Sequence, residues 1–273
     1  MRTLISVIIP TYKPQDYIWA CLDSLVNQTF DRSLFEVILV LNGCNEPYAG
    51  ELKEYIQLHM NAMNVVFIQT DQGGVSRARN LALDRAQGDF IAFLDDDDYV
   101  SPHYLEALYV AAHVDRIAIA YPYAFEDGKD SVQLPYPMTR VFERWKDAEI
   151  SLTTSARKFF SGPCMKLIPA SIIGDRRFDV KFKNGEDSIF MFLISDRIKS
   201  LKFASSEAVY YRRFRENSAV TTRRKATDII GNAFRMMVAF TGIYLKRPRA
   251  YLPSFYLTRM MAVCRSIFMN LCR

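Results

Sequence analysis

The first hundred residues alternate between short apolar runs and longer segments in which apolar residues recur at helical spacing. Four of the runs are rich in large apolar residues and are too short to form stable helices. Runs of this kind predict strands that are buried on both faces of a parallel sheet. The four predicted strands are LISVIIP (4–10), FEVILVL (35–41), VVFIQ (65–69) and DFIAFL (89–94).

Three amphipathic segments separate these runs, over residues 15–28, 48–60 and 74–88. Each predicts a helix with one apolar face. Gly88 fits the stop position of the third helix. Because strands and helices alternate strictly, we predict an α/β fold with a doubly wound, mostly parallel sheet flanked by helices.

The rest of the chain is less regular. The pattern predicts a strand over 117–123, a helix over 186–198 and another strand within 200–212, whereas 131–160 gives no clear assignment. From residue 226 onward the pattern is helical. We therefore expect a catalytic or binding domain over 1–220 and a C-terminal helical extension over 221–273.

The extension is basic as well as amphipathic. The whole chain of 273 residues has a net charge of +5, and no Asp or Glu follows Asp228. Two interpretations of 229–273 fit equally well: a helical cap on the main domain, or a peripheral contact with an anionic membrane. We expect no nucleic-acid partner, because no recognised nucleic-acid-binding module is present.

The cysteines and the apolar runs indicate where in the cell the protein is located. The five cysteines are scattered without a C-x-x-C pair, which favours reduced thiols over a zinc site. The apolar run at the N-terminus is too short for a signal peptide, and we see no run long enough to span a membrane. These features predict a cytoplasmic protein, with a possible peripheral location on the inner face of the plasma membrane.

Four consecutive aspartates, Asp95 to Asp98, follow the fourth predicted strand in FIAFLDDDDYVSP (90–102). In open α/β sheets, ligands bind just beyond the carboxyl ends of the strands. Neighbouring carboxylates repel, and Mg²⁺ or Mn²⁺ would offset that repulsion. If the strand continued, Asp95 and Asp97 would address one ion while Asp96 and Asp98 faced elsewhere. A divalent ion in this position suggests a nucleotide diphosphate.

Six segments together resemble the family 2 glycosyltransferases of the GT-A fold. They occur in the order and with roughly the spacing of that family, and they span about 215 residues in all, so the set is far more specific than any one member. The segments are SVIIPTYKPQDYIWACLDSLVNQTF (6–30), EVILVLNGCNE (36–46), GVSRARNLAL (74–83), GDFIAFLDDDDYVSP (88–102), NGEDSIFMF (184–192) and YYRRFRENS (210–218).

The resemblance implies a nucleotide-sugar donor, a divalent metal and inversion at the anomeric carbon. Asp95 and Asp97 would be the D-x-D pair, with Asp97 as the most direct metal ligand. Relatives often have two acidic residues where this chain has Leu41-Asn42, so uracil recognition would depend on the Asn42 amide. The other residues expected at the donor are Pro10, Thr11, Tyr12, Arg79, Asp96, Arg213 and Arg215. For Arg213 and Arg215 an almost equal alternative is that they are solvent-exposed residues at the end of a strand.

On the acceptor side, the resemblance implies that Asp187 is the general base, with Glu186 beside it. One carboxylate suffices to take the proton of an attacking hydroxyl. Cys164 and Lys166 would line the acceptor side. Trp145 would be either a sugar platform or, more in keeping with its type, a core or rim residue.

The prediction is a metal-dependent inverting glycosyltransferase. It would move a sugar from a nucleotide-sugar, which we expect to be a UDP-sugar, to a hydroxyl of a glycan or lipid-linked acceptor in cell-surface polysaccharide synthesis. A non-catalytic sugar-nucleotide-binding scaffold is the main alternative. A nucleotidyltransferase is a weaker one, because the glycine-rich, lysine-bearing loop expected after the first strand is missing from the sequence.

Overall fold

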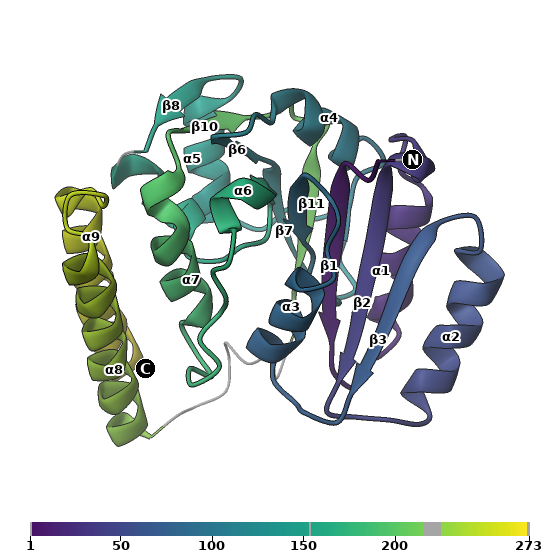
Figure 1. Cartoon of the computed structure of the whole chain (residues 1–273), viewed down its shortest axis with the longest axis horizontal. Helices are drawn as coiled ribbons and strands as arrows, with labels where there is room; N and C mark the ends of the chain where they lie inside the picture. The colour runs from purple at the N-terminus through teal and green to yellow at the C-terminus, as the bar shows by residue number, and fades with distance from the viewer. Residues whose placement is uncertain (1, 153, 216–224, 272–273) are drawn as a thin grey trace.

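A mixed eight-stranded sheet forms the centre of the molecule (Figure 1). The computed structural model describes residues 2–152, 154–215 and 225–271. Across the sheet the strands are β3 (Asn64–Thr70), β2 (Phe35–Asn42), β1 (Ile5–Thr11), β4 (Phe90–Phe93), β9 (Lys166–Pro169), β6 (Arg116–Ile119), β10 (Ser200–Phe203) and β8 (Glu149–Ser151).

The strand directions confirm a mostly parallel sheet. β1 pairs in parallel with β2 and with β4, and β2 pairs in parallel with β3. β9 runs antiparallel to both β4 and β6, and β8 runs antiparallel to β10, so these two strands alone oppose the others of the sheet. A second, smaller sheet has the order β5 (Tyr99–Val100), β11 (Val209–Phe214), β7 (Tyr121–Glu126).

Helices cover both faces of the main sheet, which explains why its strands are continuous apolar runs. Alternate residues of β1 face opposite sides: Val7 and Ile9 belong to one core cluster and Ile8 belongs to the other. The first cluster includes residues of α1 (Tyr17–Val26), α2 (Tyr48–His59) and α4 (Tyr104–Ala111), and the second includes residues of α3 (Val75–Leu83), α5 (Pro137–Trp145), α6 (Ala170–Ile173) and α7 (Glu186–Ile194).

Two of the predicted elements differ from the structure. α3 ends at Leu83 instead of reaching Gly88. Gly88 has another role, because a Cβ atom there would lie 2.5 Å from the backbone nitrogen of Ser6, so the chain needs glycine to pass β1. The predicted strand 117–123 breaks at Ala120, where the chain leaves β6 in the main sheet and enters β7 in the small sheet.

The region that gave no clear assignment, 131–160, contains α5, β8 and the 3₁₀ helix η2 (Thr154–Phe160). The 3₁₀ helices η1 (Arg32–Leu34) and η3 (Ser195–Arg197) are the other short turns of this type. Phe142 of α5 is fully buried in the main core, so this segment owes its helix to tertiary packing.

The C-terminal segment forms two long helices, α8 (Ala226–Lys246) and α9 (Pro253–Leu271), which pack together beside α7 (Figure 1). Phe240 and Phe255 are buried in the same core cluster as the sheet residues. The expected boundary near residue 220 lies outside the described residues. Among the helices described, none is both long enough and apolar enough to cross a bilayer.

Candidate active site

The four aspartates form a turn instead of extending β4. The backbone N–H of Asp98 donates to the carbonyl oxygen of Asp95 over 3.1 Å, which closes the turn. The predicted alternation, with Asp96 and Asp98 facing away from Asp95 and Asp97, is therefore wrong for Asp96. Asp95, Asp96 and Asp97 all line one cavity, whereas Asp98 is buried and borders a different, smaller cavity.

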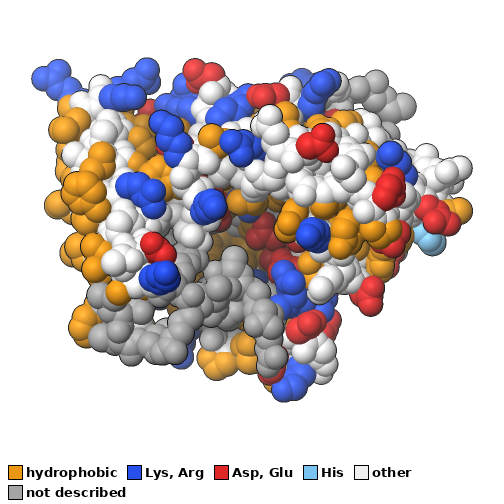
Figure 2. All heavy atoms as spheres, turned by 90° about the horizontal axis from the view of Figure 1, so that it is seen from below, with side chains coloured by type: hydrophobic (Ala, Val, Ile, Leu, Met, Phe, Trp, Pro, Cys, Tyr) orange, Lys and Arg blue, Asp and Glu red, His pale blue; other side chains and the backbone are white. Residues whose placement is uncertain are grey.

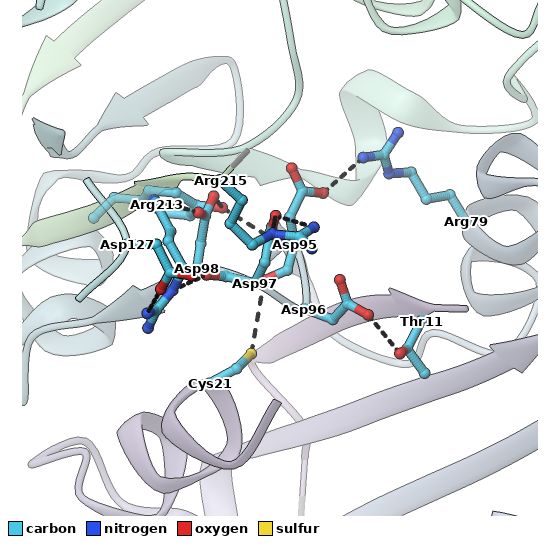
Figure 3. A network of polar contacts seen from close by, with 11 residues as sticks. Thr11, Cys21, Arg79, Asp95, Asp96, Asp97, Asp98, Asp127, Arg213 and Arg215 are labelled. Atoms are coloured by element: carbon cyan, nitrogen blue, oxygen red, sulfur yellow. Dashed lines mark hydrogen bonds and ion pairs between the residues drawn. The ribbon is translucent and has the colours of Figure 1, made fainter. Parts of the chain in front are cut away.

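Asp98 has a structural role. Its carboxylate is buried and accepts hydrogen bonds from the Tyr210 hydroxyl, over 2.7 Å, and from the backbone N–H of Arg213, over 2.8 Å. Burial raises the pKa of Asp98 well above its usual range, and the charges of Asp97 and Asp95 add to the effect. These bonds fix the turn against β11 of the small sheet (Figure 3).

The cavity beyond the ends of β1, β2 and β4 has a volume of about 560 Å³. Figure 2 shows acidic side chains deep in a hollow on this face of the molecule. The location agrees with the rule that ligands bind beyond the carboxyl ends of parallel strands. Of the residues expected at the donor, those that line this cavity are Pro10, Thr11, Tyr12, Asn42, Asp95, Asp96, Asp97 and Arg215.

Asp96 and Asp97 are held by different partners. The Thr11 hydroxyl donates to Asp96 over 2.5 Å, and the Arg215 guanidinium pairs with Asp97 over 2.6 Å (Figure 3). Burial raises the pKa of Asp96 to about 7 despite the Thr11 hydrogen bond, and burial also raises the pKa of Asp97. Ionised carboxylates in this cluster are therefore disfavoured until a further cation arrives.

Arg213 and Arg215 have different surroundings, although the sequence suggests the same role for both. The Arg215 guanidinium lies over the Tyr17 ring, 4.3 Å from its centre, and lines the cavity. Arg213 donates instead to the carbonyl oxygen of Asp97 and pairs with Asp127 over 2.7 Å, and it does not line the cavity. Arg213 braces the aspartate turn from behind.

Asn42 is committed to the protein backbone. Its Nδ2 donates to the carbonyl oxygen of Thr11 over 2.7 Å, and its Oδ1 accepts from the backbone N–H of Gly74 over 2.8 Å. The side chain is buried. Asn42 thus ties the ends of β1 and β2 to the start of α3. These bonds leave one N–H and one lone pair of the amide unengaged, but the side chain is only 3% exposed and its orientation is fixed by the backbone, so it offers little to a base.

Arg79 connects the two acidic parts of the site. Its guanidinium, 3% exposed, donates to Asp187 over 2.6 Å and to Asp95 over 2.8 Å. The Nη1–Asp187 and Nη2–Asp95 bonds fix the orientation of both carboxylates. Burial lowers the pKa of the guanidinium, but the charges of Asp187 and Asp95 outweigh it and keep the pKa above its usual value. Arg79 therefore lies between the expected base and the expected metal ligands. It was expected to approach the nucleotide, but it is buried and does not line the larger cavity, because Asp187 and Asp95 hold its guanidinium.

A second cavity, of about 280 Å³, contains the expected acceptor-side residues. Asp187, Cys164 and Lys166 line it, and Asp95 lines both this cavity and the larger one. Asp187 is in the first turn of α7, where the helix dipole favours a carboxylate. The sequence interpretation therefore placed these residues together correctly, with Asp95 at the junction of the two cavities.

Glu186 and Trp145 do not line this cavity, and the Lys166 ammonium, which does, is bound to the backbone. The Lys166 ammonium donates to the carbonyl oxygens of Gly162 and Cys164, and burial lowers its pKa to about 7. Burial, followed by the charge of Asp187, raises the pKa of Glu186 to about 7. Trp145 packs against the main core and lines neither cavity, so the sugar-platform interpretation is not supported.

The sequence interpretation missed Arg212. This residue lines the acceptor-side cavity, and its guanidinium donates to the Tyr136 hydroxyl over 2.7 Å. The neighbouring Arg213 and Arg215 drew attention because of their place in the motif. Strand alternation puts Arg212 and Arg213 on opposite faces of the strand, but it does not say which face borders the cavity. That depends on how the small sheet packs against the main one.

Asp95 and Asp97 fit the needs of a hard divalent cation. Among the described residues no three His, Cys, Asp or Glu side chains converge on one point to form a complete metal site. Mg²⁺ in nucleotide sites is commonly held by one or two carboxylates, with substrate phosphates and water as the other ligands. Two carboxylate residues beside a cavity of nucleotide size match that pattern, so a metal held jointly with the substrate fits these residues.

A family model described as "Glycosyl transferase family 2" matches residues 6–176. The chain belongs to this family. The match covers the aspartate turn, Arg79 and the acceptor-side Cys164 and Lys166, whereas Asp187 lies just beyond it.

Curated family 2 relatives include much longer proteins. The minor teichoic acid biosynthesis protein GgaB of Bacillus subtilis is 32% identical over 220 residues, which cover 78% of this chain and 23% of GgaB. TarS of Staphylococcus aureus, a poly(ribitol-phosphate) beta-N-acetylglucosaminyltransferase, is 28% identical over 222 residues, which cover 80% of this chain and 37% of TarS. The chain thus spans well under half the length of either relative.

Solved structures of the family share the fold. The crystal structure of S. aureus TarS 1-349 in complex with UDP-GlcNAc matches this chain with a TM-score of 0.72 and 24% identity, and the match covers 98% of this chain and 72% of that one. The predicted GT-A fold is therefore confirmed.

Proposed function

We propose that this chain catalyses transfer of a sugar from a UDP-sugar to a hydroxyl group of a cell-surface glycan of the teichoic acid type, with inversion at the anomeric carbon. The observation that carries the proposal is the shared position of Asp95, which lines both the larger cavity and the cavity of Asp187. A donor sugar bound at this junction would have its diphosphate in the larger cavity, and the acceptor would approach it from the smaller cavity.

The roles of the residues follow from their places. The ionised Asp187 carboxylate accepts the proton of the acceptor hydroxyl as its oxygen attacks the anomeric carbon from the smaller cavity. The bond to the diphosphate breaks on the opposite side, so one displacement inverts the configuration. Arg79 keeps the Asp187 carboxylate oriented towards the acceptor. Arg215 is placed to offset charge that develops on the leaving diphosphate.

Uridine is proposed as the base because relatives with solved complexes bind UDP and UDP-GlcNAc. The acceptor class rests on the relatives named for teichoic acid biosynthesis and for poly(ribitol-phosphate). A direct test is the release of UDP from UDP-GlcNAc and from UDP-glucose with poly(ribitol-phosphate) as the acceptor. Nucleotide binding without any acceptor-dependent release would favour the non-catalytic alternative.

We further propose that Asp97 and Asp95 hold Mn²⁺ or Mg²⁺ together with the diphosphate of the donor. When bound, the metal would neutralise charge on the leaving diphosphate. The raised pKa values of Asp96 and Asp97 agree with this: burial is their main cause and the charges of neighbouring aspartates add to it, and a cation at the cavity would favour the ionised forms. A thermal-shift titration of UDP with and without Mn²⁺ tests it, since stabilisation reports binding to the folded state. Equal shifts with and without Mn²⁺ would contradict it.

Finally, we propose that α8 and α9 contact an anionic membrane surface at the inner face of the plasma membrane. On α8, Ile230, Phe234 and Val238 recur every four residues and are more than half exposed. Figure 2 shows apolar side chains together with Lys and Arg at this end of the molecule. Sedimentation with phosphatidylglycerol vesicles should be weaker for Phe234→Ser than for the wild type, and equal sedimentation would remove the proposal.

A further inference from the structure

A third cavity lies where α8 and α9 meet α7 and η2, away from the nucleotide side. Its volume is about 300 Å³. The lining mixes hydroxyl and amide groups with an apolar wall. The residues that line it are Ser161, Ser188, Asn232, Met236, Arg259 and Val263, with six others from the same helices.

Arg259 is the charged residue in this lining, and its guanidinium is only partly satisfied. The residue is 4% exposed. Nη1 donates to the carbonyl oxygen of Phe160 over 3.2 Å and Nη2 donates to that of Arg157, at the end of η2. Nε is buried and has no hydrogen-bond partner among the described residues. Of the five N–H donors of a guanidinium, the described residues thus engage two.

The charge of Arg259 has no counter-ion in the part of the chain described. None of the ion pairs there includes Arg259, and the charge that acts on its pKa is that of another cation, Arg157. Burial and Arg157 lower the pKa of Arg259 to about 10, so the guanidinium remains charged at neutral pH. A buried cation without a partner is costly. The Phe255 ring, 4.8 Å away, offsets only part of that cost.

The cavity adjoins the proposed acceptor side. Ser161 lines both this cavity and the one that contains Asp187, and Ser188 directly follows Asp187 in α7. Hydroxyl and amide donors next to a guanidinium are typical of phosphate recognition. An apolar wall beside them suits the carbon chain that links one phosphate to the next.

We infer that this cavity binds a phosphate group of the acceptor, through the Arg259 guanidinium, while the acceptor hydroxyl is at Asp187. The inference rests on the proposed function and adds a phosphate-binding subsite to it. An acceptor recognised in this way carries phosphodiesters near the hydroxyl that is glycosylated. A lipid headgroup presents the same phosphodiester, so the source of the phosphate is settled by experiment.

The test compares binding of dimethyl phosphate, the smallest phosphodiester, with binding of UDP and Mn²⁺. Thermal shift and calorimetry on the full chain should show that Arg259→Met weakens dimethyl phosphate binding by at least about tenfold, with UDP binding unchanged. Asp97→Asn should do the reverse. Arg265→Gln, an exposed charge on the same helix, is the matched control and should change neither.

Two further arms make the result decisive. Ala262→Phe fills the cavity without removing a charge, so it should also abolish dimethyl phosphate binding. This variant provides the test if Arg259→Met does not fold. Arg259-dependent sedimentation with phosphatidylglycerol vesicles would assign the phosphate to a lipid, and its absence would assign it to the acceptor polymer. Dimethyl phosphate binding that persists in both variants, or that is absent from the wild type, would overturn the inference. If the wild-type protein does not bind UDP, that result would instead count against the proposed function.

Discussion

Arg79 donates to the carboxylate of Asp187 over 2.6 Å from a position that is almost completely buried. The other end of the same guanidinium holds Asp95. Through this residue the expected base and an expected metal ligand share one fixed cation. Proximity catalysis depends on such fixed positions, because small displacements of reacting groups lower rates strongly.

Replacing Arg79 by Met should therefore harm both stability and activity. Two carboxylates would lose their shared cation, and we expect a loss of about 2–4 kcal/mol in the free energy of unfolding, discounted because Asp95 is partly exposed. Transfer should fall by on the order of 10²-fold. Urea denaturation and initial rates measure the two effects. Arg77→Met, an exposed arginine on the same helix, should change neither, and an active, stable Arg79→Met enzyme would refute the role.

Asn42→Asp should destabilise the protein without changing which nucleotide binds. The new carboxylate would place an oxygen against the carbonyl oxygen of Thr11, where Nδ2 now donates. We expect a cost of about 1–3 kcal/mol in the free energy of unfolding. Competition between UDP and GDP, followed by calorimetry, should give the same preference in the wild type and the variant. A changed preference would mean that position 42 does read the base.

Glu186 should make stability fall as pH rises from about 4 to about 7. Its pKa is raised to about 7 in the folded chain, against about 4.3 in an unfolded one. Between these values the unfolded chain releases the proton while the folded chain retains it, so unfolding becomes more favourable as pH rises. Glu186→Gln should therefore be more stable than the wild type at about pH 8 and similar to it at about pH 4.

Urea denaturation at several pH values measures this effect. The exposed Glu54→Gln is the control and should follow the wild-type profile. A Glu186→Gln variant with an unchanged pH profile of stability would show that the folded environment does not hold the Glu186 proton.

Arg215→Gln should separate metal binding from nucleotide binding. The Arg215 guanidinium forms an ion pair with the Asp97 carboxylate over 2.6 Å, so a metal ion must compete with it for that carboxylate. In the variant, Mn²⁺ alone should bind more tightly, whereas UDP with Mn²⁺ should bind more weakly because a cation near the diphosphate is lost. Calorimetry measures both constants. A change of the same sign in both would argue against this competition.

The sequence predicted the first half of the fold well because its signals are local. Short, continuous apolar runs bounded by turn residues indicate strands covered on both faces, and the helices between them have regular apolar stripes. α5 was missed because its helix depends on burial of Phe142 against distant parts of the chain. The chain between 117 and 123 was assigned to one strand because a switch between sheets leaves no local mark.

The candidate site was likewise predicted where the signal lies in a local motif, and missed where it depends on tertiary packing. Motif order brought Asp95 and Asp187 together, and the structure joins them through Arg79, which is buried and does not line the larger cavity as expected. Asp96 and Asn42 line the expected cavity, but Asp96 does not point away from Asp95 and Asp97 as strand alternation predicted, and the Asn42 amide is bonded to the backbone. Arg213 does not line the cavity, because its guanidinium binds the Asp97 carbonyl and Asp127. Arg259 was counted only as part of a basic tail, since burial of a cation cannot be seen in composition.

Asp187→Asn tests the central claim most directly, when it is measured beside Asp97→Asn. We predict that Asp187→Asn lowers transfer from the UDP-sugar by about 10²–10⁴-fold while UDP and Mn²⁺ bind as tightly as they do to the wild type. Asp97→Asn should weaken metal-dependent nucleotide binding as well as transfer. Normal transfer by Asp187→Asn would contradict the account, because it would mean that another group, such as Asp95 or Asp98 of the same cavity, serves as the base.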